Sequence, residues 1–67
     1  MSFTRQAMNK LPESAKNRIE YYRNNAKTDQ RYRELYISKS SGYIQCLIDT
    51  GIITESDGKC IRAYITI

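Results

Sequence analysis

The amino-acid sequence predicts a mainly α fold: an αα-hairpin followed by a short third element near the C-terminus. Apolar side chains recur every three or four residues in two long segments, which is the period of a helix with one buried face. Between these segments stand two asparagines, which favour turns because their side chains bond the local backbone. At 67 residues the chain is expected to form a single small domain, residues 1–67.

The first helix of the hairpin is expected over residues 12–25. Pro12 is tolerated in a first helical turn, and Glu13 suits the positive end of the helix dipole. Helical spacing then continues through Leu11, Ala15, Ile19, Tyr22 and Ala26. Residues 24–27 are expected to form the turn, and residues 1–10 to be either a frayed arm or a first helical turn.

The second helix is expected within residues 28–51. Thr28 can cap its start, and Gly51 stands where a helix commonly ends in a left-handed residue. The apolar positions that share its helical phase are Tyr32, Leu35, Tyr36, Tyr43, Ile44, Leu47 and Ile48.

Residues 38–42, with the sequence SKSSG, are the weak point of this second helix, because serine and glycine disfavour helix interiors. One interpretation keeps a single helix, in which Ser40 and Gly42 let a neighbour approach closely. It is favoured because the apolar stripe continues without a slip. The other interpretation has two helices joined by a turn at residues 38–41, a helix-turn-helix.

The shared helical phase predicts which side chains form the core of the chain and which would be exposed unless a second chain covers them. Six side chains are predicted to be largely buried: Ile19, Tyr22, Leu35, Tyr36, Leu47 and Ile48. A chain of this size buries only about 60% of the surface that its unfolded form exposes. Ile37, Ile53 and Tyr64 lie off the stripe, so we expect a homodimer that covers them.

Residues 52–67 allow two interpretations. Asp57-Gly58 is a hairpin signal, and the apolar residues that follow alternate as they do in a strand. Against this, Thr54 and Asp57 have the spacing of a capping box, with aspartate in place of the usual glutamate. A helix that starts at Glu55 is slightly favoured, although Gly58 is a handicap inside it, and a β-hairpin wing is the alternative.

Residues 42–54 resemble the end of a winged-helix recognition helix that runs into a first wing strand, with residues 59–66 as the returning strand. The resemblance covers less than half of the chain, and no family is assigned from it.

Several kinds of chemistry are not expected. The chain has no histidine and only two cysteines, so catalytic sets that need histidine are impossible and a structural zinc site lacks ligands. Cys46 is expected to be a small buried hydrophobe on the helix stripe. We therefore expect no enzyme, no cofactor and no metal. Without a signal peptide or a long apolar run, a cytoplasmic protein is expected, with no membrane partner.

The charge is unevenly distributed. Residues 1–34 carry eight cations and four carboxylates, which accounts for the net charge of +4, whereas residues 35–67 carry three of each. The excess concentrates around the hairpin turn, where Tyr21, Tyr22 and Tyr32 interleave with it. Such a patch can neutralise phosphates while aromatic faces accept bases. The candidate nucleic-acid-binding residues are Arg18, Arg23, Lys27, Arg31 and Arg33.

Two functions follow as hypotheses. The first is a small DNA-binding or transcription-regulating accessory factor that contacts the phosphate backbone. The second is a small helical module that binds and modulates a partner protein, by analogy with the accessory or inhibitor proteins of phages and mobile elements, which share its size and basic charge. An ordinary solvated helical surface would explain the same charges without any partner.

Overall fold

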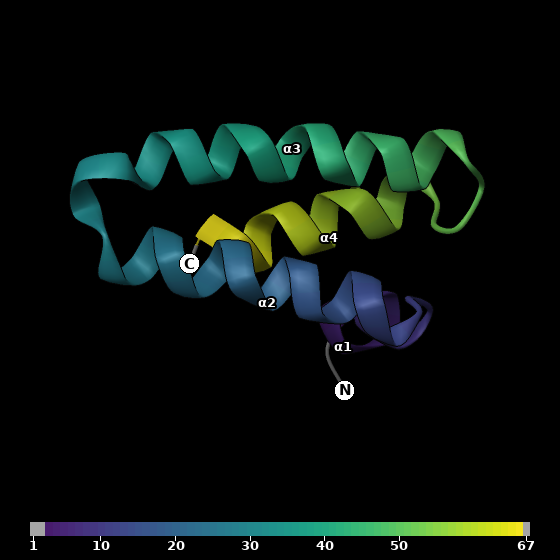
Figure 1. Cartoon of the computed structure of the whole chain (residues 1–67). Coiled ribbons are helices and arrows are strands. Elements are labelled where there is room, and N and C mark those ends of the chain that lie inside the picture. The colour runs from purple at the N-terminus through teal and green to yellow at the C-terminus, as the bar shows by residue number, and fades with distance from the viewer. Residues whose placement is uncertain (1–2, 67) are drawn as a thin grey trace.

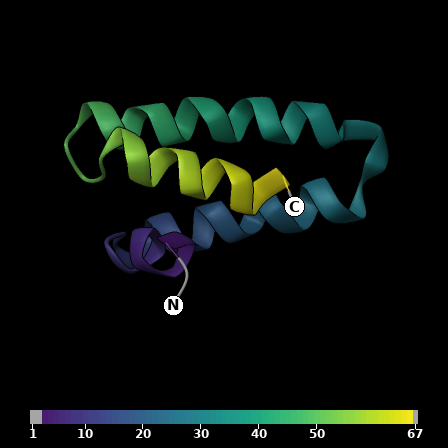
Figure 2. The ribbon, with the colours of Figure 1, turned by 180° about the vertical axis from the view of Figure 1, so that it is seen from behind.

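The computed structural model describes residues 3–66, which form a mainly α fold, as predicted. In chain order the elements are α1 (Phe3–Asn9), α2 (Glu13–Thr28), the short 3-10 helix η1 (Gln30–Tyr32), α3 (Arg33–Asp49) and α4 (Glu55–Thr66). Figure 1 shows α2 and α3 as an antiparallel hairpin, with α4 lying along both of them. From behind, α1 and α4 come to the front, and α1 contacts α4 (Figure 2).

The hairpin turn lies later in the chain than the asparagines indicated. Residues 24–27 belong to α2, and the chain reverses at Asp29. The prediction that Thr28 caps the second helix is also wrong, because its hydroxyl donates to the carbonyl of Asn24 at 2.9 Å inside α2. Asn25 likewise donates to the carbonyl of Tyr21 at 2.7 Å. These side chains bond the preceding helical turn, and the longer helix buries Ala26 completely.

The second helix of the hairpin is continuous. Residues 38–42 lie inside α3, so the single-helix interpretation is confirmed and the helix-turn-helix is wrong. Ser40 is buried, and its hydroxyl donates to the carbonyl of Ile37 at 2.7 Å, which satisfies it within the helix. Gly42, however, is exposed and would meet nothing within 4 Å if it carried a Cβ. It does not serve a close approach, contrary to the expectation.

The end of α3 is the left-handed glycine termination that the sequence predicts. Gly51 has φ +81°, in the region that favours glycine. The N–H of Gly51 donates to the carbonyl of Ile48 at 3.0 Å. The N–H of Ile52 donates to the carbonyl of Leu47, also at 3.0 Å. This pair of bonds is the Schellman arrangement, which satisfies carbonyls that the helix end would leave without partners.

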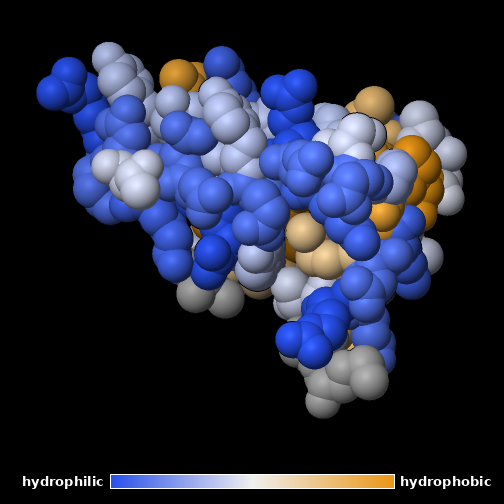
Figure 3. All heavy atoms as spheres, turned by 60° about the horizontal axis from the view of Figure 1, so that its bottom comes forward, coloured by the Kyte–Doolittle hydropathy of each residue, from blue (hydrophilic) through white to orange (hydrophobic). Residues whose placement is uncertain are grey.

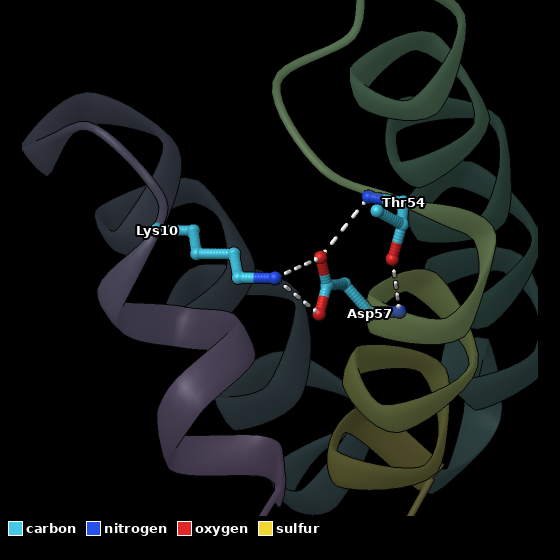
Figure 4. Close-up of polar contacts among 3 residues, drawn as sticks. All are labelled: Lys10, Thr54 and Asp57. Carbon is cyan, nitrogen blue, oxygen red and sulfur yellow. Dashed lines mark hydrogen bonds and ion pairs between the residues drawn. The ribbon is translucent and has the colours of Figure 1, made fainter.

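The C-terminal segment is helix α4, so the third-helix prediction is confirmed, and the β-hairpin wing and the winged-helix resemblance are both wrong. The capping box decides its start. The backbone N–H of Thr54 donates to a carboxylate oxygen of Asp57, whose own N–H donates to the hydroxyl of Thr54 (Figure 4). The two residues thereby satisfy backbone donors that the first turn of a helix leaves free.

Gly58 is the residue that permits close approach of two helices. It is buried in α4, and a Cβ built on it would lie 2.7 Å from Ile48 Cδ1 and 3.3 Å from Ile44 Cγ2 of α3. Glycine has a low helix propensity and so weakens α4 locally. Because it has no side chain, however, it lets α4 lie close against α3.

The hydrophobic core draws on all four helices and on the connections between them. Its buried members are Ala7, Leu11, Ala15, Ile19, Ile44, Leu47, Ile53, Ile61 and Ile65. Phe3–Asn9 form helix α1, so the expectation of a frayed arm is wrong over residues 3–10; residues 1 and 2 lie outside the described residues. Among the α-helices at residues 3–66, none has the length and apolar character that crossing a membrane requires.

The predicted core is only partly correct. Ile19 and Leu47 are buried, as predicted, whereas the other four predicted members are not: Tyr22, Tyr36 and Ile48 are half-buried, and Leu35 is 49% exposed. The face of α3 that meets the core is set by Ile44. Leu35 precedes Ile44 by nine residues, or two and a half helical turns, and so lies on the opposite side.

Two further expectations of burial are corrected. Cys46 is exposed, because it follows Ile44 by two residues and so lies on the far side of α3. Ile53 is buried to 4% exposure, and Ile37 and Tyr64 are half-buried. Ile53 belongs to the core of the chain itself, and Ile37 and Tyr64 pack against that core, so no second chain is needed to cover them. The homodimer stays a prediction, but this reason for it no longer holds.

Candidate nucleic-acid interface

Four of the five candidate cations lie at the end of the molecule where α2 reverses into α3. We call Arg23, Lys27, Arg31 and Arg33 the turn cations. The C-terminal part of α4 reaches this end, since Arg23 contacts Tyr64 and Arg33 contacts Thr66. The sequence predicted that a hairpin would gather these four side chains at one end, and these contacts agree with that placement.

Two of the turn cations are engaged with the backbone. Arg23 Nε donates to the carbonyl of Tyr64 at 3.1 Å, and its guanidinium lies 4.4 Å from the centre of the Tyr64 ring. Arg33 donates to the carbonyls of Ala26, at 3.4 Å, and Thr66, at 2.9 Å. Both arginines therefore bind carbonyls near the C-terminal end of α4, and Arg33 also binds one near the end of α2. A cation at these positions also offsets the helix dipole.

The other two turn cations face solvent. Lys27 and Arg31 are exposed, and the Arg31 guanidinium lies 5.9 Å from the centre of the Tyr32 ring, which is itself 48% exposed. Asp29 and Glu34 fall in the same stretch, so residues 23–34 carry four cations and two carboxylates, a net charge of +2. Lys27 and Arg31 are therefore the turn cations most accessible to a ligand.

The fifth candidate, Arg18, is not part of this cluster. It precedes Lys27 by nine residues of α2, or two and a half helical turns, and so points to the opposite side of that helix. There it lines an open hollow together with Ser14, Asn17 and Tyr21. Figure 3 brings the lower side of Figure 1 forward and shows mostly hydrophilic residues on that face.

Sequence reasoning missed Ser14 and Asn17 as neighbours of Arg18. A signal was available, because residues 14, 17, 18 and 21 follow the spacing of one helical face. Polar residues at that spacing are common on solvated helices, so the pattern alone did not distinguish a hollow from ordinary surface.

A row of tyrosines joins α2 to α3. The ring of Tyr21 meets the edges of Tyr22 and Tyr36, with centroid separations of 5.6 Å and 6.3 Å, and Tyr22 lies 6.2 Å from Tyr43. Such edge contacts fix the orientation of the rings. Tyr21 nevertheless remains 50% exposed.

Tyr64 ties α4 to α2. Its hydroxyl donates to the carboxylate of Glu20, and Arg23 covers its ring. The hydrogen bond to Glu20, with burial as a smaller cause, raises the pKa of Tyr64 above its ordinary value of 10.0. Tyr64 thus stays neutral at physiological pH and joins α4 to α2. Arg23 and Arg33 add hydrogen bonds to carbonyls of the same helix, α4.

Residues 3–66 contain no group of three or more cysteine and carboxylate side chains that could together hold a metal ion. Comparisons with models of protein families, with curated proteins and with solved structures find no match for the chain.

Proposed function

We propose that the chain is a non-enzymatic protein that binds nucleic acid through the phosphate backbone, as an accessory or transcription-regulating factor. The observation that carries the proposal is the pair Lys27 and Arg31, two solvent-facing cations, with the half-exposed Tyr32 beside Arg31. Cations that neutralise phosphates supply affinity that does not depend on base sequence. An exposed ring beside them can stack on a base.

The turn cations have different roles in this proposal. Arg23 and Arg33 hold the end of α4 and so keep the surface in shape, while Lys27 and Arg31 contact phosphates. The C-terminal ends of α2 and α4 carry partial negative charge, which opposes an approaching phosphate. Affinity is therefore expected to be modest and strongly dependent on salt.

The test is the salt dependence of duplex DNA binding, measured by fluorescence anisotropy. Replacing Lys27 and Arg31 together by glutamine should reduce the slope of log affinity against log salt by about 1.8, since each phosphate contact contributes about 0.9. Replacing the exposed pair Lys39 and Lys59 removes the same charge from α3 and α4 and should leave most of the slope intact. Equal losses in both variants, or no binding at low salt, would contradict the proposal.

The second candidate is a helical module that binds a partner protein. Leu35 favours it, because this aliphatic side chain is 49% exposed on α3, three residues after the exposed Tyr32. Neighbouring apolar side chains on a helix surface are typical anchors for a partner. Replacing Leu35 by glutamine, which adds no charge near Arg31, should abolish capture of a partner while leaving DNA affinity nearly unchanged, and the opposite result would exclude this surface.

A further inference from the structure

The hollow on α2 has the chemical character of a nucleotide site. It measures about 360 Å³ and is lined by Ser14, Asn17, Arg18 and Tyr21. The lining therefore offers one cation, one hydroxyl, one amide and one aromatic ring, and it includes no carboxylate. A phosphate needs the cation and the hydrogen-bond donors, and a base needs the ring.

The ring of Tyr21 is held in place and remains accessible. It makes edge-type contacts with the rings of Tyr22 and Tyr36, at centroid separations of 5.6 Å and 6.3 Å. Tyr21 is still 50% exposed and lines the same hollow as Arg18. A ring that is already fixed loses little conformational freedom when a base stacks on it, which favours binding.

Arg18 is available to a ligand. Its side chain is exposed, and no ion pair or hydrogen bond engages it within residues 3–66, unlike Arg23 and Arg33. Arg18 lies three residues before Tyr21, so the two side chains are neighbours on one helix face. A guanidinium and an aromatic ring at this spacing can hold the phosphate and the base of the same nucleotide.

We infer that this hollow takes one nucleotide of a single-stranded nucleic acid, with the base on Tyr21, the phosphate on Arg18, and Ser14 and Asn17 as hydrogen-bond partners. The inference rests on the proposed function and adds to it the class of substrate. A base in a duplex is covered by its neighbours, so stacking on Tyr21 selects single strands. The open hollow encloses little of a free nucleotide, and the site acts as one contact along a strand.

The experiment compares binding of a fifteen-residue thymidine strand with binding of an abasic strand of equal length and charge. Stacking of one base should make the thymidine strand bind about 5- to 150-fold more tightly. Replacing Tyr21 by leucine should bring the ratio of the two affinities, thymidine strand to abasic strand, close to one. The control is Phe3→Leu, which removes an exposed aromatic ring from α1, outside both proposed contact surfaces, and should preserve the ratio. Arg18→Gln should weaken both strands and reduce the salt slope by about 0.7.

The outcomes separate this inference from the proposed function. Equal affinity of the wild type for both strands, or an unchanged ratio in Tyr21→Leu, overturns the nucleotide site and leaves phosphate binding intact. No binding of either strand overturns the nucleotide site, and the proposed function falls with it only if duplex DNA also fails to bind at low salt. Should Tyr21→Leu fail to fold, photo-crosslinking of the wild type to a strand that carries 5-iodouracil replaces it. An adduct on Tyr21 supports the site, and adducts on other residues alone overturn it.

Discussion

Thr54 and Asp57 exchange hydrogen bonds at the start of α4. The N–H of Thr54 donates to Asp57 Oδ2 at 3.0 Å, and the N–H of Asp57 donates to Thr54 Oγ1 at 3.1 Å. The ammonium of Lys10, which follows α1, lies 3.1 Å and 2.9 Å from the two carboxylate oxygens of Asp57 (Figure 4). Asp57 thus caps α4 and also joins it to the segment after α1.

Removing the cap should weaken the whole domain. Thr54→Ala deletes the hydroxyl that accepts the N–H of Asp57 and should lower the free energy of unfolding by about 1 kcal/mol. Ser56→Ala is the control, because Ser56 is exposed in the same helical turn. Urea denaturation followed by circular dichroism measures both variants. Equal stability of the two would show that the Thr54 hydroxyl contributes nothing.

Asp57 should make the protein sensitive to acid. The backbone hydrogen bond from Thr54 and, next, the hydrogen bond from Lys10 lower the pKa of Asp57 below its ordinary value of 3.8. Its contribution to stability is therefore present above the unfolded pKa and is lost as the pH falls from about 4 through the folded pKa.

Asp57→Asn tests this contribution. The variant should be less stable than the wild type at pH 7, and the difference should shrink as the pH falls below 4. Urea midpoints at pH 7, 5, 4 and 3 give the comparison. A difference that stays constant over this range would mean that the ionised carboxylate is not the stabilising group.

The two helical glycines should respond oppositely to alanine. Gly42→Ala places a methyl group in open space and should raise stability by about 0.5–1 kcal/mol through helix propensity. Gly58→Ala directs a methyl group at Ile48 Cδ1, 2.7 Å away, and at Ile44 Cγ2. Overpacking of this kind costs about 1–3 kcal/mol, which exceeds the gain in propensity.

The clash at Gly58 can be relieved from the other side. Ile48→Val removes the Cδ1 atom, so the double variant Gly58→Ala/Ile48→Val should be more stable than the sum of the two single changes predicts. Thermal melts of the four proteins complete the cycle. Strict additivity would show that this contact does not limit the approach of α4 to α3.

Two leucines of α3 should differ sharply. Leu47→Ala empties a buried core position and should cost about 2–5 kcal/mol, enough to unfold a domain of this size. Leu35→Ala truncates a side chain that is 49% exposed and should change stability by less than about 1 kcal/mol. A melting curve of Leu47→Ala that matches the parent would remove Leu47 from the core.

A homodimer at micromolar concentration is the prediction for assembly. Such a dimer would cover exposed apolar side chains, among which are Phe3, Leu35 and Ile52. Light scattering should give twice the mass of one chain. A single-chain mass at high concentration would contradict the dimer and leave these side chains to another partner or to solvent.

Local signals in the sequence located the starts of α2 and α4 and the end of α3. Gly51 ends α3 because only a left-handed residue completes the bonds from residues 51 and 52. The spacing of Thr54 and Asp57 indicated the start of α4, and the continuous apolar stripe carried α3 through its serines. The basic residues near the turn were also visible. These features depend on neighbours within a few residues, which a sequence displays directly.

Tertiary structure decided which face of each helix is buried and what each cation does. Leu35 is exposed because Gly58 of α4 packs against Ile44 and Ile48, and Leu35 lies on the side of α3 opposite Ile44. Arg23 and Arg33 looked like any other surface cations until the end of α4 came beside them. These outcomes depend on contacts between residues about 10 to 40 positions apart. The helical period gives the directions of side chains relative to one another on a single helix. Only the packing of another helix decides which of those directions is buried.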